Sequence, residues 1–238
     1  MQKLAEDLRQ LTGLHMTARQ QEQFALYARE LVDWSTRMNL TTILDEDGIR
    51  IKHFLDSLSC LLVMDQAMPG RVVDVGSGAG FPGIPLKIML PEMRLTIIES
   101  VQKKTIFCRH LVEALGLEGV EVEALRVEDA GRMPKHRQQY DWALARALGP
   151  MPVVAEYLLP LVRVGGTMLT QRGLNGAQEA EDARRAMLIF GGKLREARKV
   201  SLPGLEERYL LVVEKVKPTP PDYPRRAGIA VKKPLIKH

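Results

Sequence analysis

A run of closely spaced glycines is the segment of this 238-residue chain best suited to bind a ligand. It reads Asp74-Val75-Gly76-Ser77-Gly78-Ala79-Gly80-Phe81-Pro82-Gly83, and a β-branched run at 72–75 leads into it. Glycines let a backbone turn sharply and approach a ligand closely, and the prolines at 82 and 85 suit the first turn of a following helix. Gly78, Gly80 and Gly83 match the GxGxxG spacing, so the pattern alone admits a dinucleotide such as NAD.

Asp74, two residues before the first glycine, favours S-adenosylmethionine over NAD. A carboxylate at the mouth of the strand repels a pyrophosphate but attracts the ammonium and sulfonium groups of a methionine moiety. We therefore expect Asp74, Gly76 and Gly78 to bind S-adenosylmethionine. The alternatives are a nicotinamide-dependent oxidoreductase, a nucleic-acid or assembly protein that has lost cofactor binding, and, for Asp74 itself, a simple loop cap.

Two further acids follow the next two expected strands. Glu99 ends the run at 95–98, where its two oxygens could accept both hydroxyls of a ribose. Glu128 lies in the turn after the run at 120–125, from which it could reach an adenine edge. The carboxyl ends of successive strands are where open α/β sheets bind ligands, so both acids are candidate nucleoside contacts; a surface acid and a solvated turn are the alternatives.

The residues at the end of the fourth expected strand argue against two classes of methyl-accepting atom. Methylation of C5 of a pyrimidine needs a cysteine nucleophile there, and the segment Asp141-Trp142-Ala143-Leu144-Ala145-Arg146-Ala147 holds none. It also lacks the Asp/Asn-Pro-Pro-aromatic turn that orients exocyclic amines. The segment therefore favours neither of these two classes of methyl acceptor.

Alternating strands and helices should position these residues. From 71 onward, β-branched runs at 72–75, 95–98, 120–125, 142–145 and 167–170 alternate with helical segments near 84–90, 102–115, 153–161 and 178–190. This order predicts βαβ units and a parallel sheet. The runs at 193–202 and 208–216, joined at Pro203-Gly204, predict a hairpin that adds an antiparallel edge. We expect a Rossmann-like α/β fold with a seven-stranded, mostly parallel sheet, as in class I methyltransferases.

The first 69 residues predict an N-terminal helical cap. Apolar residues recur at steps of three and four through 24–38 and 51–62, and a loop at 39–48 separates the two helices. Asn39, His53, Asp56 and Ser57 are polar residues in or beside these helices that could contact the RNA base or close over the cofactor. The alternative is that they cap helices or, for His53, pack in the core.

The net charge of +5 comes from the C-terminal residues, because 215–238 carry +6 and 1–214 carry −1. Residues 215–238 hold seven basic side chains against one acid, and five prolines follow Lys217. We expect residues 217–238 to form an extended basic arm, after a methyltransferase domain at 70–216, with Arg225, Arg226, Lys232 and Lys233 on RNA phosphates. A solvated tail is the alternative. Cys60 and Cys108 are predicted to be core thiols, and we expect no metal, no membrane contact and a cytoplasmic monomer.

Motifs along nearly the whole chain resemble one known family. They are Asn39-Leu40-Thr41, His53-Phe54-Leu55-Asp56-Ser57-Leu58, the glycine segment 74–85, Arg126-Val127-Glu128, Arg146-Ala147, Tyr223-Pro224-Arg225-Arg226-Ala227-Gly228-Ile229 and Lys232-Lys233-Pro234-Leu235. Together they are similar to ribosomal RNA small subunit methyltransferase G. The chain departs from that pattern at Arg172-Gly173, where the family has Lys-Gly, and at Ala230, where it has proline.

The resemblance implies transfer of a methyl group from S-adenosylmethionine to N7 of one guanine of 16S ribosomal RNA. That nitrogen carries a lone pair and loses no proton before it attacks, so catalysis there needs positioning and no general base. The resemblance also implies a cofactor site lined by Gly76, Phe81, Val127, Glu128 and Arg146. For Arg146 the sequence leaves three roles open, namely a cofactor contact, an RNA phosphate contact and an ion pair with a neighbouring acid.

Overall fold

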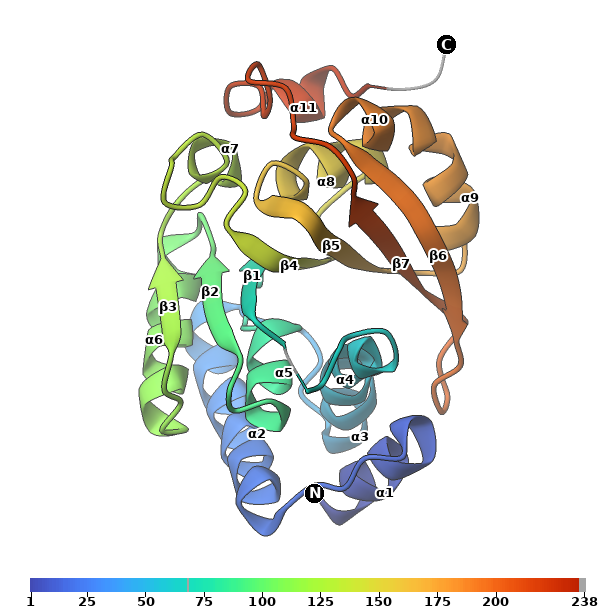
Figure 1. The fold of residues 1–238 in the computed structure, drawn as a ribbon. Helices are drawn as coiled ribbons and strands as arrows, with labels where there is room; N and C mark the ends of the chain where they lie inside the picture. The colour runs from blue at the N-terminus through green and yellow to red at the C-terminus, as the bar shows by residue number, and fades with distance from the viewer. Residues whose placement is uncertain (68, 236–238) are drawn as a thin grey trace.

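The computed structural model describes residues 1–67 and 69–235 and contains a single seven-stranded sheet (Figure 1). The strands lie in the order β3-β2-β1-β4-β5-β7-β6. Their bounds are β1 (Arg71–Val75), β2 (Arg94–Ile98), β3 (Val120–Glu123), β4 (Tyr140–Arg146), β5 (Val162–Arg172), β6 (Gly192–Val200) and β7 (Arg208–Lys215). The predicted class of fold is confirmed.

Strands β1 to β5 are parallel, and the last two are not. In the centre of the sheet Asp74 of β1 pairs with Ile97 of β2 and Leu144 of β4. Strand β7 pairs antiparallel with both β5 and β6, so the predicted hairpin is confirmed and its second strand is the inner one. This insertion brings Arg208, at the start of β7, close to the carboxyl end of β5.

Helices cover both faces of the sheet because its strands bury side chains on both sides. Val72 belongs to a core cluster with α2 (Ala18–Met38), α5 (Gly83–Met89) and α6 (Gln102–Ala114). Val73, the next residue, belongs to the opposite cluster with α8 (Met151–Leu158). The second face also packs against α7 (Val127–Ala130), α9 (Gly176–Asp182) and α10 (Arg184–Ile189). The single helix predicted near 178–190 is therefore two short helices.

The N-terminal region packs on the first face. It consists of α1 (Gln2–Thr12), α2, α3 (Glu46–Gly48), the π-helical turn η1 (Ile49–Leu55), α4 (Asp56–Leu58) and the 3₁₀ turn η2 (Ser59–Leu62). Thr17 and Gln20 form a reciprocal capping box at the start of α2. Phe24 and Leu31 of α2 are fully buried, as the helical spacing predicts. The second predicted helix is instead divided, and its widest turn, η1, carries His53.

The C-terminal segment is not a free extended arm, so that prediction is wrong. It lies across the end of the domain beside α7, α8 and α10 and ends in the short helix α11 (Ile229–Lys232) (Figure 1). Thr219 and Ala230 are both buried. The lysine at 237, counted above in the charge of this segment, lies outside the described residues. Within 1–67 and 69–235, the helices all fall short of the length and apolarity that a bilayer span requires.

Candidate functional site

The glycine loop follows β1 and bends over the carboxyl end of the sheet. Gly76 and Gly78 have φ angles of 65° and 62°, in the left-handed region that favours glycine. A Cβ on Gly76 would lie 2.5 Å from a methyl carbon of Leu148, whereas a Cβ on Gly78 would meet no atom within 4 Å. The space beside Gly78 is therefore open to a ligand, and the space beside Gly76 is already closed by Leu148.

Asp74 is fully buried below this loop. Its Oδ2 accepts a hydrogen bond from the backbone N–H of Gly83 at 2.8 Å, while Oδ1 is buried with no hydrogen-bond partner among the described residues. Burial raises the pKa of Asp74 to about 7, against the opposing effects of the Gly83 N–H and Arg146. The unpartnered carboxylate oxygen fits a cationic ligand, because a positive group would restore its ionised form.

Glu99 lies directly against the glycine loop at the end of β2. Its Oε2 accepts from the Gly78 N–H at 3.1 Å and its Oε1 from the Val101 N–H at 2.8 Å. These two bonds fix the carboxylate, and each oxygen keeps a lone pair for another donor. The structure thus places Glu99 at the open side of Gly78, where a ribose would meet it.

Glu128, in α7, is almost fully buried and holds two donors on one oxygen. Its Oε1 accepts from the Tyr157 hydroxyl at 3.1 Å and from the Gly228 N–H at 2.9 Å. Burial and the Glu128 carboxylate raise the pKa of Tyr157, so the phenol remains a donor. Val127, the preceding residue, packs in the second core. The sequence pattern gave no sign of Tyr157 or of the C-terminal donor.

Phe81 joins the glycine loop to the helical cap. Its ring is stacked against the His53 imidazole, with centroids 4.6 Å apart, and against the Tyr27 ring at 5.2 Å. The Arg146 guanidinium lies 4.8 Å from the same ring centroid. Phe81 therefore contacts η1, α2 and the end of β4 at one point.

Arg146 is held by the cap rather than left free for a phosphate. It donates to the Lys52 carbonyl at 2.9 Å, to Asp56 Oδ2 at 3.1 Å and to His53 Nδ1 at 3.3 Å. Of the three roles that the sequence leaves open, the ion pair with a neighbouring acid is the one present in this structure.

His53 is neutral in this arrangement, and its tautomer follows from its partners. Arg146 only donates, so Nδ1 accepts and the proton lies on Nε2, which donates to Thr41 Oγ1 at 2.9 Å. Burial and then Arg146 lower the pKa of His53 to about 4. Both ring nitrogens are engaged, so His53 is a poor general base here.

A cavity of about 590 Å³ opens between the cap and the carboxyl ends of β4 and β5. It brings together three of the predicted residues, His53, Asp56 and Arg146. Its other charged and polar walls are Lys52, Gln171, Arg172, Glu179 and Arg208. Four cations face two acids, and among the described residues buried polar atoms of Gln171 and Arg208 have no hydrogen-bond partner. The excess positive charge suits a phosphate-bearing substrate.

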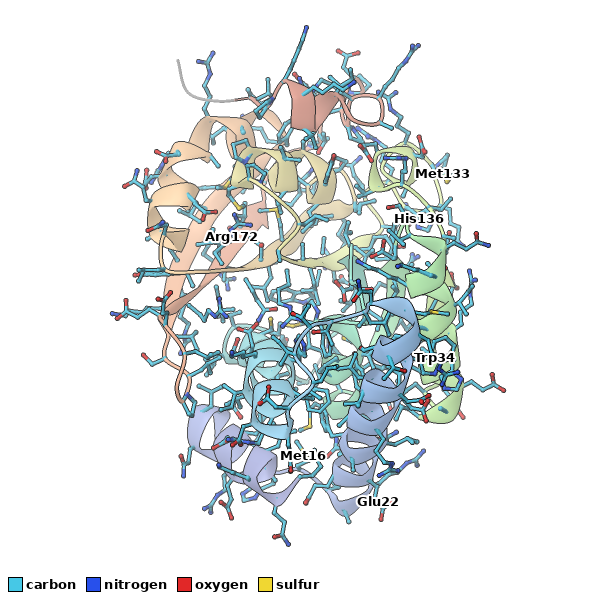
Figure 2. All side chains as sticks on the ribbon, turned by 180° about the vertical axis from the view of Figure 1, so that it is seen from behind. Met16, Glu22, Trp34, Met133, His136 and Arg172 are labelled. Atoms are coloured by element: carbon cyan, nitrogen blue, oxygen red, sulfur yellow. The ribbon has the colours of Figure 1, made fainter. Side chains whose placement is uncertain are left out.

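Sequence reasoning missed Gln171 and Arg208 and noticed Arg172 only as a departure from a family pattern. Arg172, labelled in Figure 2, lies beside α9 and donates to the Glu179 carboxylate at 2.7 Å. Gln171 donates to the Asp56 carbonyl at 2.6 Å, which ties β5 to the cap. In the sequence, the only indication that Gln171 and Arg172 belong to a site is that they are polar and directly follow a predicted strand.

The remaining predicted RNA contacts are scattered. Asn39 is exposed and ends α2 in the left-handed conformation, and the Ser57 hydroxyl is buried and donates to the His53 carbonyl. Asn39 therefore caps a helix, as its structural alternative required, whereas Ser57 bonds back to the preceding helical turn instead of capping a helix. Arg225 forms an ion pair with the buried carboxylate of Glu156, whereas Arg226, Lys232 and Lys233 are exposed. The four basic residues of the C-terminal segment thus divide into one structural residue and three available ones.

Comparison with known proteins identifies the family. The protein-family model described as rRNA small subunit methyltransferase G matches residues 20–208 of this chain. The chain is 48% identical over 223 residues to "Ribosomal RNA small subunit methyltransferase G" of Roseiflexus sp. (strain RS-1), covering 94% of this chain and 95% of that protein. It is 42% identical to the protein of the same name from Alkaliphilus metalliredigens (strain QYMF), covering 94% of each.

Solved structures with the same fold are more distant in sequence. The putative methyltransferase complexed with the Trm112 methyltransferase activator of Haloferax volcanii gives a TM-score of 0.57 at 12% identity, covering 79% of this chain and 98% of that chain. A mutant of the 16S rRNA (adenine(1408)-N(1))-methyltransferase from Catenulisporales acidiphilia gives 0.52 at 14% identity, covering 65% and 89%. These matches support the fold alone. The family model and the full-length relatives go further, and by them this chain belongs to the rRNA small subunit methyltransferase G family.

Proposed function

We propose that this chain transfers a methyl group from S-adenosylmethionine to N7 of a guanine in the 16S RNA of the small ribosomal subunit, in the cytoplasm. One observation carries the proposal beyond family membership. Phe81 belongs to the glycine loop and also contacts His53 and Arg146, which line the cationic cavity. A cofactor beside the loop and a base in the cavity would therefore be neighbours.

The residues beside the loop fit S-adenosylmethionine. Gly78 leaves open space, Glu99 offers fixed oxygens for ribose hydroxyls, and Asp74 has a buried oxygen without a hydrogen-bond partner among the described residues, which a cationic group would satisfy. Val127 and Glu128 would lie on the adenine side. When bound, the cofactor supplies an electrophilic methyl group on a sulfonium.

The chain's own groups then have to bind and orient the acceptor, not deprotonate it. His53 already uses both ring nitrogens, and its pKa lowered to about 4 makes it a weak base. Guanine N7 carries no proton, so this site needs no base. Arg146, fixed by Asp56 and stacked on Phe81, gives the cavity a rigid wall against which a base can be positioned.

The cavity walls support an RNA substrate. Lys52, Arg172 and Arg208 line the same cavity as Arg146. Guanidinium groups bind phosphate oxygens well, and their excess over Asp56 and Glu179 leaves the cavity positive.

Binding of S-adenosylmethionine and NADH to the purified chain, compared by equilibrium dialysis, tests the cofactor assignment. We expect saturable binding of S-adenosylmethionine at one site and none of NADH. Binding of NADH alone would restore the oxidoreductase interpretation, and binding of neither would leave a fold without its enzymatic activity.

A further inference from the structure

The C-terminal segment, residues 217–235, is fastened to the domain by buried polar contacts. Just before it, Lys215 is fully buried and donates to the Thr219 hydroxyl inside the segment, as well as to the carbonyls of Leu159 and Phe190. The guanidinium of Arg137 then donates to the carbonyls of Thr219, Pro220 and Tyr223, at 2.7 to 3.1 Å. If the segment left, Lys215 would lose its Thr219 partner and the half-buried Arg137 guanidinium would lose three acceptors, so the docked position is favoured.

The strongest fastening is the ion pair between Arg225 and Glu156. Glu156, on α8, is 1% exposed, and its carboxylate accepts from the Arg225 backbone N–H at 2.9 Å and from the guanidinium at 2.6 to 3.2 Å. A carboxylate buried this deeply is costly without its cation. Arg225 is therefore bound to Glu156 through both its backbone and its side chain, and this contact positions the residues that follow it.

Three residues after Arg225, the segment reaches the cofactor side of the domain. The Gly228 N–H donates to Glu128 Oε1, the same oxygen that receives the Tyr157 hydroxyl. Pro224 packs on the end of α7, since a Cβ on Gly131 would lie 2.8 Å from its ring. The α7 turn thus has the C-terminal segment as its outer wall.

We propose that the C-terminal segment is a positioning element of the cofactor site: the Arg225–Glu156 ion pair holds Gly228 against Glu128 and so fixes the turn Val127–Glu128 that borders the adenosine. The inference rests on the proposed function, because it takes this turn as part of the cofactor site. Arg225 acts through Glu128 and does not touch the cofactor.

A double-mutant cycle measured by isothermal titration with S-adenosylmethionine tests this positioning role. Arg225→Ala should weaken binding roughly fivefold to tenfold, and Glu128→Ala should weaken it by at least as much. The double variant should bind S-adenosylmethionine no more weakly than Glu128→Ala alone, because Arg225 affects binding only through Glu128. Lys217→Ala is the matched control, since it removes one exposed positive charge from the same segment and should leave the affinity unchanged.

Exchange of backbone amides provides a second readout, in the wild type and in one variant. Binding at the site and docking of the segment are reciprocal, so S-adenosylmethionine should slow hydrogen exchange of the wild-type amides at 225–231. Glu156→Gln, which keeps the size of the side chain but not its charge, should speed that exchange and weaken binding without unfolding the domain.

The outcomes separate this inference from the proposed function. If wild type binds no S-adenosylmethionine, the proposed function fails. If wild type binds and Arg225→Ala binds equally well, or the two single effects simply multiply in the double variant, the positioning role is overturned while the proposed function stands. A Glu128→Ala variant with unchanged affinity overturns it too.

Discussion

The imidazole of His53 lies nearly flat on the ring of Phe81, with the centroids 4.6 Å apart and the planes 13° from parallel. One ring comes from the π-helical turn of the cap and the other from the glycine loop. Because Arg146 also bonds His53 and lies over Phe81, the cap, the loop and the end of β4 meet at a single contact. Changes to these residues should therefore affect both the glycine loop, where the cofactor is proposed to bind, and the cationic cavity.

The pH dependence of stability should reveal the neutral state of His53. Its folded pKa of about 4 lies below the ordinary value of 6.5, so the unfolded chain takes up the proton first as the pH falls. The stability that His53 contributes is complete above about pH 6.5 and is lost as the pH falls toward 4. Between about pH 7 and pH 5 this loss is about 2 kcal/mol.

Urea denaturation of wild type and His53→Asn over this range measures the effect. Asparagine can accept from Arg146 but does not titrate, so the variant should lose less stability on acidification than wild type. Equal pH slopes would show that the fold does not lower the pKa of His53.

Gly78→Ala tests whether the open side of the loop is the ligand's place. The new methyl group meets no protein atom, so the fold should lose only the backbone strain of about 1 kcal/mol for a left-handed alanine. Binding of S-adenosylmethionine should be lost.

Gly116→Ala is the matched control for this variant. Gly116 has a φ of 59° and equally open surroundings, but it lies in the turn after α6. It should show the same loss of stability with unchanged affinity. Gly76→Val is a poorer test, because its side chain would clash with Leu148 before it reached any ligand. Full affinity in Gly78→Ala would place the cofactor elsewhere.

Asp74 should make cofactor affinity depend on pH. Its pKa, raised to about 7 by burial, means that the carboxyl group is neutral in the free protein below that pH and ionised above it. Affinity for a cationic ligand should therefore rise with pH through about 7. The ionisation also lowers the stability of the fold: this loss builds up as the pH rises from 3.8, where the unfolded group ionises, to about 7, and is complete above 7.

Asp74→Asn separates these two effects. Asparagine keeps an acceptor for the Gly83 N–H but carries no charge. At about pH 8 the variant should be more stable than wild type, yet bind S-adenosylmethionine roughly tenfold more weakly, with no pH dependence around 7. Titration calorimetry at several pH values measures the affinity, and thermal denaturation measures the stability. An affinity that still depends on pH in the variant would exclude Asp74 as the cause of that dependence.

The exposed lysines of the C-terminal segment should contact RNA phosphates, whereas Arg225 should not. Lys232→Ala with Lys233→Ala should weaken RNA binding and flatten its dependence on the logarithm of salt by roughly one unit per lost contact. Affinity for S-adenosylmethionine should stay the same. Arg225→Ala should instead weaken binding of S-adenosylmethionine and leave RNA binding and its salt dependence unchanged. An unchanged salt slope in the lysine variant would show that Lys232 and Lys233 do not contact RNA phosphates.

The sequence predicts the sheet well because buried strands and alternating helices leave a local pattern. It predicts Asp74, Glu99 and Glu128 as neighbours for the same reason, since the ends of parallel strands meet. Arg225 was assigned wrongly because its partner, Glu156, lies in an apolar helical stretch 69 residues earlier, and tail charge alone says nothing of a buried carboxylate. Arg208 joins the cavity only because β7 inserts beside β5, a pairing that no local pattern specifies.

The direct test of the central claim is methyl transfer to small ribosomal subunits from cells that lack this protein. The purified chain, isotopically labelled S-adenosylmethionine and these subunits should yield one 7-methylguanosine per 16S RNA, located by borohydride and aniline cleavage and confirmed by mass spectrometry of the nucleosides. Label on 5-methylcytidine or N6-methyladenosine, or no label in 16S RNA although the chain binds the cofactor, would contradict the assignment of guanine N7 as the acceptor.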